Sequence, residues 1–322
     1  MAWNSFELDT GGGKTCFMIT LGDSLFIGTA KDDNGVVERI HELKRDKKTN
    51  EFKLKGGEIW GRRSKTPLFE RIALQFKDIV SLLRLDKPIQ EKAIAALIEI
   101  ALDLSKAEEA FLDYVETEDA AVSQYHDPKG ITPQKNALIY KNPTHTLKEI
   151  AEKVLIRIII AYRKFPEVIS IIRGETFNIG KTFVNNLAKL LPADHPDSKS
   201  FEYDNNWIKE LYDIRGYIEH ERWEILPFDV LQSEGDASCH VERCRVVIKS
   251  QGEKPINLAA YLNVTLYNMI TFIEKMVALA IIDKMPYPTR IVTLPETERP
   301  KRNHYRYVAD LVPEVKEKLP AN

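Results

Sequence analysis

Two residues in the second half of the chain have side chains suited to chemistry on a phosphate ester. Arg215 and His220 lie five positions apart in the segment Leu211–Trp223. A histidine accepts or donates a proton near neutral pH, because its unperturbed pKa is about 6.5. An arginine stays protonated and offers a planar pair of donors to phosphate oxygens. Cleavage of RNA by its own 2′-hydroxyl needs these groups, so Arg215 is predicted to hold the phosphate and His220 to transfer protons.

A helix is predicted over Asn205–Trp223, and its apolar residues locate this pair. The predicted buried stripe follows helical spacing and consists of Trp207, Leu211, Ile214 and Ile218. At ~100° per residue, Arg215 falls at the edge of the stripe and His220 almost opposite it. A two-fold interface on that side would bring two such pairs into one cleft. Tyr217 and Glu219, between the pair, are candidates for orienting or substrate-binding roles.

The Arg-x4-His pattern of Arg215 and His220, in a helical context, resembles the signature of the HEPN superfamily. The resemblance covers about a dozen residues of motif. It implies a helical bundle and a homodimeric, metal-independent endoribonuclease that leaves 2′,3′-cyclic phosphate ends. It also implies a toxin, abortive-infection or antiphage-defence role, with an inhibitory or activating protein partner. Gly216 departs from the family, where a polar residue often follows the arginine, and Arg222 stands where some subfamilies have tyrosine.

The same segment supports an alternative without catalysis. Lys209 with Asp213, and Arg215 with Glu219, are opposite charges four positions apart, which is typical of a surface helix. The protein would then be a helical interaction module with a degenerate motif, whose helix face binds a partner protein.

The tail supplies a further set of candidates, because it mixes cations with aromatic rings. Such a mixture suits phosphate contacts and base stacking. The predicted RNA contacts are Arg222, Lys301, Arg302, Tyr305 and Arg306. The alternative for the tail is that Tyr305 and Tyr307 pack on the helices.

Neither a cofactor nor a metal is predicted. The segments Gly11–Thr15 and Gly174–Thr182 approach a phosphate-binding loop, but their glycine spacing is wrong for one. Cys239, His240 and Cys244 lack the second paired set of a structural zinc site, so the two cysteines are predicted to act as small apolar residues.

Composition favours a folded cytoplasmic protein. The net charge is −2, with 43% hydrophobic and 29% charged residues, so nucleic-acid contact would require local patches. Three cysteines fit a reducing compartment. The N-terminal residues lack a signal-peptide pattern, and no apolar run approaches the ~20 residues that span a bilayer. We therefore expect no membrane contact.

The hydrophobic pattern predicts an α+β fold that is mainly α. Residues 1–64 are β-rich and expected to form a small antiparallel sheet, residues 65–285 a helical bundle, and residues 286–322 a proline-containing basic and aromatic tail. A β-hairpin is predicted before the last long helix, pairing Trp223–Leu226 with Arg243–Ile248. Residues 118–144 are predicted to be a loop. Helices are predicted after Pro67, from Pro88, from Thr146 toward Pro166, over Thr182–Leu191, over Asn205–Trp223 and over Pro255–Ile282.

Overall fold

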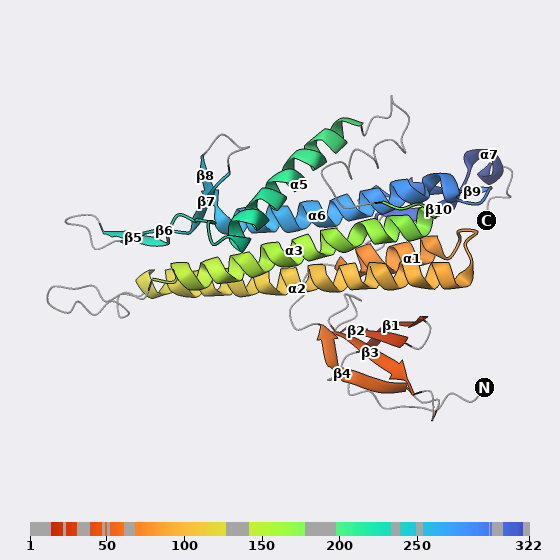
Figure 1. Ribbon diagram of the computed structural model, residues 1–322, viewed down its shortest axis with the longest axis horizontal. Helices are drawn as coiled ribbons and strands as arrows, with labels where there is room; N and C mark the ends of the chain where they lie inside the picture. Colours follow the sequence, from red (N-terminus) through yellow and green to blue (C-terminus); the bar gives the residue numbers. More distant parts are fainter. Residues whose placement is uncertain are drawn as a thin grey trace. The chain divides into compact units, whose positions relative to one another are not determined.

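The fold is α+β and mainly helical, as predicted (Figure 1). The computed structural model describes residues 14–21, 24–30, 39–46, 49, 52–60, 68–126, 142–177, 198–232, 239–248, 254–295, 297 and 305–317. The chain divides into two compact units. The first contains residues 1–105, 164–178 and 273–322, and the second contains residues 106–163 and 179–272.

The N-terminal region forms the predicted antiparallel sheet. Its strands are β1 (Lys14–Leu21), β2 (Ser24–Ala30), β3 (Arg39–Arg45) and β4 (Phe52–Trp60), and each pairs with the next along the chain. Leu25, Ile27 and Leu43 form a buried cluster on one face. Leu25 lies directly opposite Leu43 in the register of β2 and β3, so the alternation of apolar residues fixes this pairing.

Three long helices carry most of the core: α2 (Lys87–His126), α3 (Thr144–Arg173) and α6 (Leu258–Ile281). The boundary between the units falls inside each of them. In the first unit, Lys164 of α3 pairs with Glu99 and Asp103 of α2, at 3.1 and 2.8 Å. Arg173 of α3 donates to the carbonyl of Ala280 in α6 at 3.3 Å. These contacts join the three helices laterally around apolar residues.

The helix α6, extended by a short 3-10 turn (Ile282–Lys284), is long and apolar enough to cross a membrane by composition alone. In its most apolar window, however, 72% of the residues are buried inside the structure. This burial is that of a core helix in a soluble protein.

A two-stranded sheet forms in the tail, where no regular structure was predicted. Strand β9 (Thr289–Thr293) pairs antiparallel with β10 (Tyr307–Leu311), and the short helix α7 (Pro313–Lys316) follows. The pairing is between segments that the sequence separates by a proline-containing stretch, so local periodicity does not reveal it.

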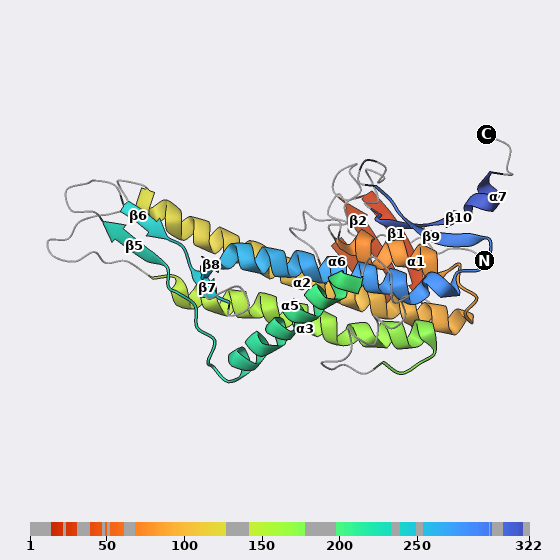
Figure 2. The same cartoon turned by 90° about the horizontal axis from the view of Figure 1, so that it is seen from above.

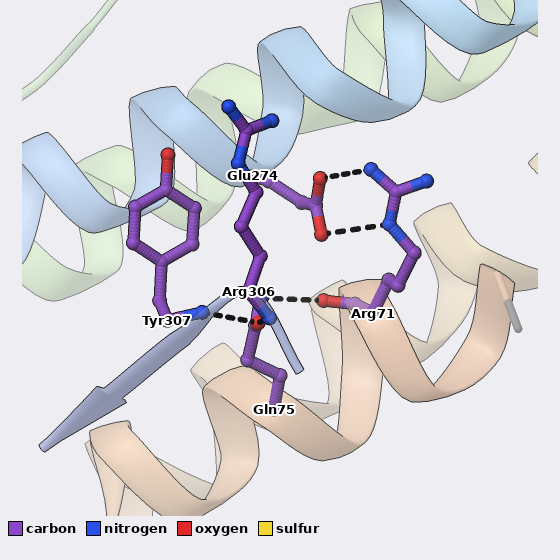
Figure 3. Close-up of polar contacts among 5 residues, drawn as sticks. All are labelled: Arg71, Gln75, Glu274, Arg306 and Tyr307. Carbon is purple, nitrogen blue, oxygen red and sulfur yellow. Dashed lines mark hydrogen bonds and ion pairs between the residues drawn. The ribbon is translucent and has the colours of Figure 1, made fainter. Parts of the chain in front are cut away.

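The tail is attached to the segment formed by a π-helical turn, η1 (Glu70–Leu74), and α1 (Gln75–Val80). The side-chain oxygen Oε1 of Gln75 accepts hydrogen bonds from the backbone N–H groups of Arg306 and Tyr307, at 2.5 and 2.8 Å (Figure 3). The ring of Tyr307 is buried, and its centroid lies 6.2 Å from the ring centroid of Phe76. The hydroxyl of Tyr305 donates to Asp78 at 3.1 Å. Tyr305 and Tyr307 therefore pack on the helices, as the alternative for the tail predicted.

The second unit is built around α5 (Ser198–Glu219), which runs obliquely to α6 (Figures 1 and 2). The ring of Trp207 lies edge-on to Phe272 of α6, with centroids 6.1 Å apart. Tyr212 lies edge-on to Tyr162 of α3, with centroids 5.7 Å apart. The residues of α5 that are most buried are Ile208, Leu211 and Ile214. The predicted stripe is thus confirmed at its centre, while Trp207 and Ile218 are only half-buried.

The predicted hairpin exists, but its strands are shifted. Strand β5 (Asp229–Gln232) pairs with β6 (Cys239–Glu242), and β7 (Arg245–Val247) pairs with β8 (Pro255–Asn257). The expected pairing of Trp223–Leu226 with Arg243–Ile248 is reduced to a single bridge between Leu226 and Arg245.

The helix α2 is longer than the sequence predicted. It continues to His126, so residues 118–126 are helical and not part of a loop, whereas residues 127–141 lie outside the described part of the chain. Arg243 explains this extension: its guanidinium donates to Glu118 at 2.7 Å and pairs with Asp119 at 2.8 Å. Glu118 is completely buried, and it also accepts a hydrogen bond from Tyr114 at 3.0 Å. The buried carboxylate of Glu118 is thus paired in the fold.

Other helix boundaries also differ from the prediction, including that of α5, which begins at Ser198 rather than Asn205. Helix α3 begins at Thr144 rather than Thr146, because Asn142 Oδ1 accepts the N–H of Thr144 at 2.9 Å. It continues through Pro166 to Arg173. Helix α6 begins at Leu258, since residues 255–257 form β8 and Asn257 Oδ1 caps the N–H of Ala260 at 2.9 Å. The helix predicted over residues 182–191 lies outside the described residues.

Candidate functional site

The motif lies at the C-terminal end of α5, where the predicted helix to Trp223 is wrong. The helix ends at Glu219, and His220 is the first residue of a turn. The N–H of Glu221 donates to the carbonyl of Ile218 at 3.0 Å, and that of Arg222 donates to the carbonyl of Tyr217 at 2.7 Å. These two bonds form a Schellman motif, the common way in which a helix satisfies its last carbonyls.

Glu221 adopts the left-handed conformation that this turn requires, with φ of 56°. Glycine usually occupies this position, because a side chain costs roughly 1–2 kcal/mol there. The turn directs the chain away from the helix axis, and the side chain of His220 is exposed. His220 therefore does not serve as a buried structural histidine.

Arg215 lies one and a half turns earlier, and its side chain is 28% exposed. Its Nη2 pairs with the Oε1 of Glu219 in the same helix, as the alternative interpretation predicted. A pair of this kind contributes only about 0.3–0.5 kcal/mol, so a phosphate group can replace the carboxylate at little cost. Within the described chain, no hydrogen bond or ion pair joins Arg215 to His220.

The sequence analysis missed Tyr212, which lies next to Arg215. Its hydroxyl is buried and has no hydrogen-bond partner among the described residues. Burial raises the pKa of Tyr212, and the positive charges of Arg163 and Arg215 oppose this increase. Arg163 of α3 is thus a second cation close to the motif. The spacing of three between Tyr212 and Arg215 could have shown that they share one side of the helix.

A cavity of about 860 Å³ lies along another face of α5. Residues from α5, the segment 222–224, β7 and α6 line it, including the candidates Tyr217 and Arg222. Arg215 and His220 are not among the lining residues. The structure therefore divides the predicted site: Tyr217 and Arg222 face the cavity, while Arg215 and Glu219 form their own pair beside it.

Three carboxylates, those of Glu210, Asp213 and Glu224, line this cavity together with the cations Lys209 and Arg222. Burial raises the pKa of Glu210, and the nearby charge of Asp213 raises it further. Burial also raises the pKa of Tyr261, and the negative charge of Glu210 is the next largest cause of this increase. Glu210 is therefore a partly desolvated acceptor in the cavity wall, close to the phenol of Tyr261.

The tail candidates belong to the first unit, whereas the motif belongs to the second. Lys301 and Arg302 lie outside the described residues. Burial raises the pKa of Tyr305, and its hydroxyl is engaged by Asp78. The guanidinium of Arg306 lies 5.8 Å from the ring centroid of Tyr307, which places it for a cation–π contact (Figure 3).

The other sequence candidates are only partly described. Cys244 is buried, which fits the predicted small apolar residue. Burial raises the pKa of its thiol to about 11, and the charge of Glu118 adds to the effect. A protonated thiol is a poor metal ligand. The side chains of Cys239 and His240 lie outside the described residues, as do residues 11–13 and 178–182 of the two glycine-containing segments.

Comparison of the chain with protein-family models, with curated proteins and with solved structures gives no match. The function must therefore be inferred from the chemistry of these residues.

Proposed function

We propose that the protein is a metal-independent endoribonuclease of the HEPN type, acting as a cytoplasmic homodimer in a toxin or antiphage-defence role. The observation that carries the proposal is the exposed position of His220 beside a helix whose other side is buried. The solvent-facing His220 and the guanidinium of Arg215, five positions earlier, are the two groups that cleavage of RNA needs. Arg163 is a further cation, close to the same Tyr212 as Arg215.

In the proposed reaction, His220 accepts the proton of a ribose 2′-hydroxyl, and the 2′-oxygen attacks the adjacent phosphorus atom. The bond to the 5′-oxygen breaks, and this oxygen takes up a proton that protonated His220 donates, which returns His220 to its neutral form. The products are a 2′,3′-cyclic phosphate and a 5′-hydroxyl. Arg215 exchanges Glu219 for the phosphate and stabilises the charge that develops on it, which is worth about 3 kcal/mol for a group of this kind.

A second copy of the chain completes the proposed centre. Arg215 and His220 are about 140° apart around an ideal helix, and the chain leaves α5 at His220. A two-fold axis near this end of α5 would place Arg215 of one subunit opposite His220 of the other. The predicted inhibitory or activating partner protein would act on the same exposed surface.

The first test compares wild type, Arg215→Ala and His220→Ala by RNA integrity after induced expression, with chelator present in the lysate. We expect wild type to fragment RNA and each substitution to reduce cleavage by about 100-fold or more. Lys153→Ala, an exposed cation on α3, is the matched control and should leave cleavage unchanged. Intact RNA with all four proteins, at equal soluble amounts, would remove the catalytic proposal.

A mixing experiment tests the shared centre. If each centre takes Arg215 from one subunit and His220 from the other, a heterodimer of Arg215→Ala and His220→Ala regains one complete centre. Mixing the two inactive proteins after partial denaturation should then restore up to about a quarter of the wild-type activity, since half of the dimers are mixed and each has one centre of two. No recovery at all, with mixed dimers verified, would place both residues in one subunit.

A second candidate function is a non-catalytic interaction module, in which the motif is degenerate. The pair between Arg215 and Glu219 favours it, because that pair occupies the guanidinium. In this case His220→Ala should leave RNA intact, as should wild type, and should instead weaken binding of the partner protein.

A further inference from the structure

The cavity along α5 has an aromatic wall that the proposed cleavage step does not use. Tyr203, Glu210 and Tyr217 line it and follow one another at intervals of seven residues, so they lie on one face of the helix. This face spans ~21 Å, which exceeds the size of one nucleobase. Tyr203 is 59% exposed and Tyr217 42% exposed. Exposed rings in a concave surface are platforms for stacking of unpaired bases.

Trp207, between Tyr203 and Tyr217 along α5, gives the cavity an apolar surface whose position is fixed by its neighbours. Its indole N–H donates to Asp204 at 3.2 Å. Its ring lies edge-on to Phe272, with centroids 6.1 Å apart. Because the indole is held on two sides, a ligand meets a rigid apolar surface here, and little conformational entropy is lost on binding.

The carboxylates define which edge of a base would fit. Glu210 and Asp213 offer acceptors only, when ionised, and both line the cavity. Guanine presents two adjacent donors, N1–H and the N2 amino group, to which one carboxylate can accept two parallel hydrogen bonds. Uracil presents one donor between two carbonyl oxygens, and these oxygens would face the carboxylates unfavourably.

Cations are placed for the backbone of the same ligand. Lys209 and Arg222 line the cavity together with the carboxylates. Arg222 reaches it because the turn after α5 brings its backbone N–H within 2.7 Å of the carbonyl of Tyr217. Positive side chains beside stacking rings are the usual means of holding a single strand by its phosphates. The turn that carries His220 lies at this end of the cavity.

We propose that this cavity binds single-stranded RNA, with an unpaired guanine stacked on Tyr217, its donor edge facing Glu210 and Asp213, and another base of the strand on Tyr203. The proposal rests on the proposed function, because it names the substrate of the same protein. It predicts that cleavage occurs close to unpaired guanines, and that duplex RNA is a poor substrate because its bases are stacked and paired.

The test measures binding without cleavage. Fluorescence anisotropy with His220→Ala protein compares a labelled uridine hexamer with the same hexamer containing one guanine. We expect the guanine hexamer to bind roughly tenfold more tightly. Glu210→Gln should reduce this preference, because glutamine offers one acceptor oxygen and its amide N–H₂ opposes the second donor of guanine. Tyr217→Ala should weaken both hexamers by about tenfold. Glu109→Gln, an exposed glutamate on α2, is the matched control and should change nothing.

Equal binding of the two hexamers, or an unchanged preference in folded Glu210→Gln protein, would overturn the proposal. Thermal melting shows whether that variant folds, and Asp213→Asn provides a second, more exposed position if it does not. The two proposals fail separately. If the guanine hexamer binds more tightly but wild type leaves RNA intact, only the ribonuclease proposal is refuted. If wild type cuts RNA but the two hexamers bind equally, only the guanine site is refuted.

Discussion

Replacing Arg71 by methionine should destabilise the protein by about 3–5 kcal/mol, because it leaves a buried carboxylate without its partner. Arg71 Nε donates to Glu274 Oε1 at 2.9 Å, and Arg71 Nη2 donates to Glu274 Oε2 (Figure 3). The side chain of Glu274 is 0% exposed and that of Arg71 is 15% exposed. Two charge-assisted hydrogen bonds at about 1.5–3 kcal/mol each give a consistent magnitude.

Because Glu274 is more buried than Arg71, the variants should differ in how much they lower the free energy of unfolding. Glu274→Leu should cost less, about 1–3 kcal/mol, because the guanidinium left behind can reach solvent and stay hydrated. The double variant Arg71→Met/Glu274→Leu should be close to wild type, because an apolar pair fills the space and no charge is left buried. The three values therefore give a large coupling energy between the two positions.

Urea unfolding followed by far-ultraviolet circular dichroism and by tryptophan fluorescence supplies the measurement. The two signals should give coincident transitions with unchanged slope, so that the midpoint reports the free energy of unfolding. A cost below about 1 kcal/mol for Arg71→Met, or a larger cost for Glu274→Leu than for Arg71→Met, would refute the assignment of the penalty to the buried carboxylate.

Three further substitutions test other parts of the structure. Glu221→Gly should raise the free energy of unfolding by about 1 kcal/mol, since glycine adopts the left-handed conformation freely, and a lowered melting temperature would contradict this. Burial holds the pKa of Cys244 at about 11, above its usual value, so the folded state keeps a proton that the unfolded state loses. The free energy of unfolding should therefore fall as the pH rises from about 9 to about 11. Urea titrations at these pH values should show a shallower fall for Cys244→Ala. Glu219→Gln should change stability by less than about 0.5 kcal/mol but tighten RNA binding by freeing Arg215, and unchanged affinity in the anisotropy assay would show that the pair does not compete with phosphate.

Local periodicity predicted the elements whose stability depends on their own apolar pattern. The N-terminal strands alternate around Leu25, Ile27 and Leu43, and the structure confirms them. The centre of α5 at Leu211 and Ile214 is buried, as the helical spacing indicated. In these cases, the residues that face the core are determined by the period of the secondary structure itself.

Contacts between distant segments decided the boundaries that the sequence did not predict. Residues 118–126 are predicted to belong to a loop because prolines and a glycine follow them, but Arg243, 125 positions after Glu118, neutralises Glu118 inside the fold. Pro166 does not end α3, because the flanking residues Phe165 and Ile169 are buried and hold the helix on both sides.

At the candidate site, the structure shows how the predicted residues are grouped, and this grouping differs from the prediction. It placed Arg215 and His220 in one helix, but the turn at Glu221 ends that helix before His220. Glycine usually marks a helix end, but here Glu221 takes the left-handed conformation, so the sequence lacks this sign of where the helix ends. Nothing in the spacing of Tyr217 and Arg222 showed that they line a cavity together, because that depends on where α6 and β7 pass.

The attachment of the tail through Gln75 also sets an order of events during synthesis. Gln75 and the residues whose N–H groups it accepts are 231 and 232 positions apart. At ~5–20 residues per second, a ribosome needs roughly 10 to 50 seconds to make the second partner after the first. Until then, the oxygen of Gln75 must be hydrated or shielded by a chaperone. A chain released before Arg306 leaves that acceptor without its donors, so incomplete copies are destabilised and more readily degraded than finished ones.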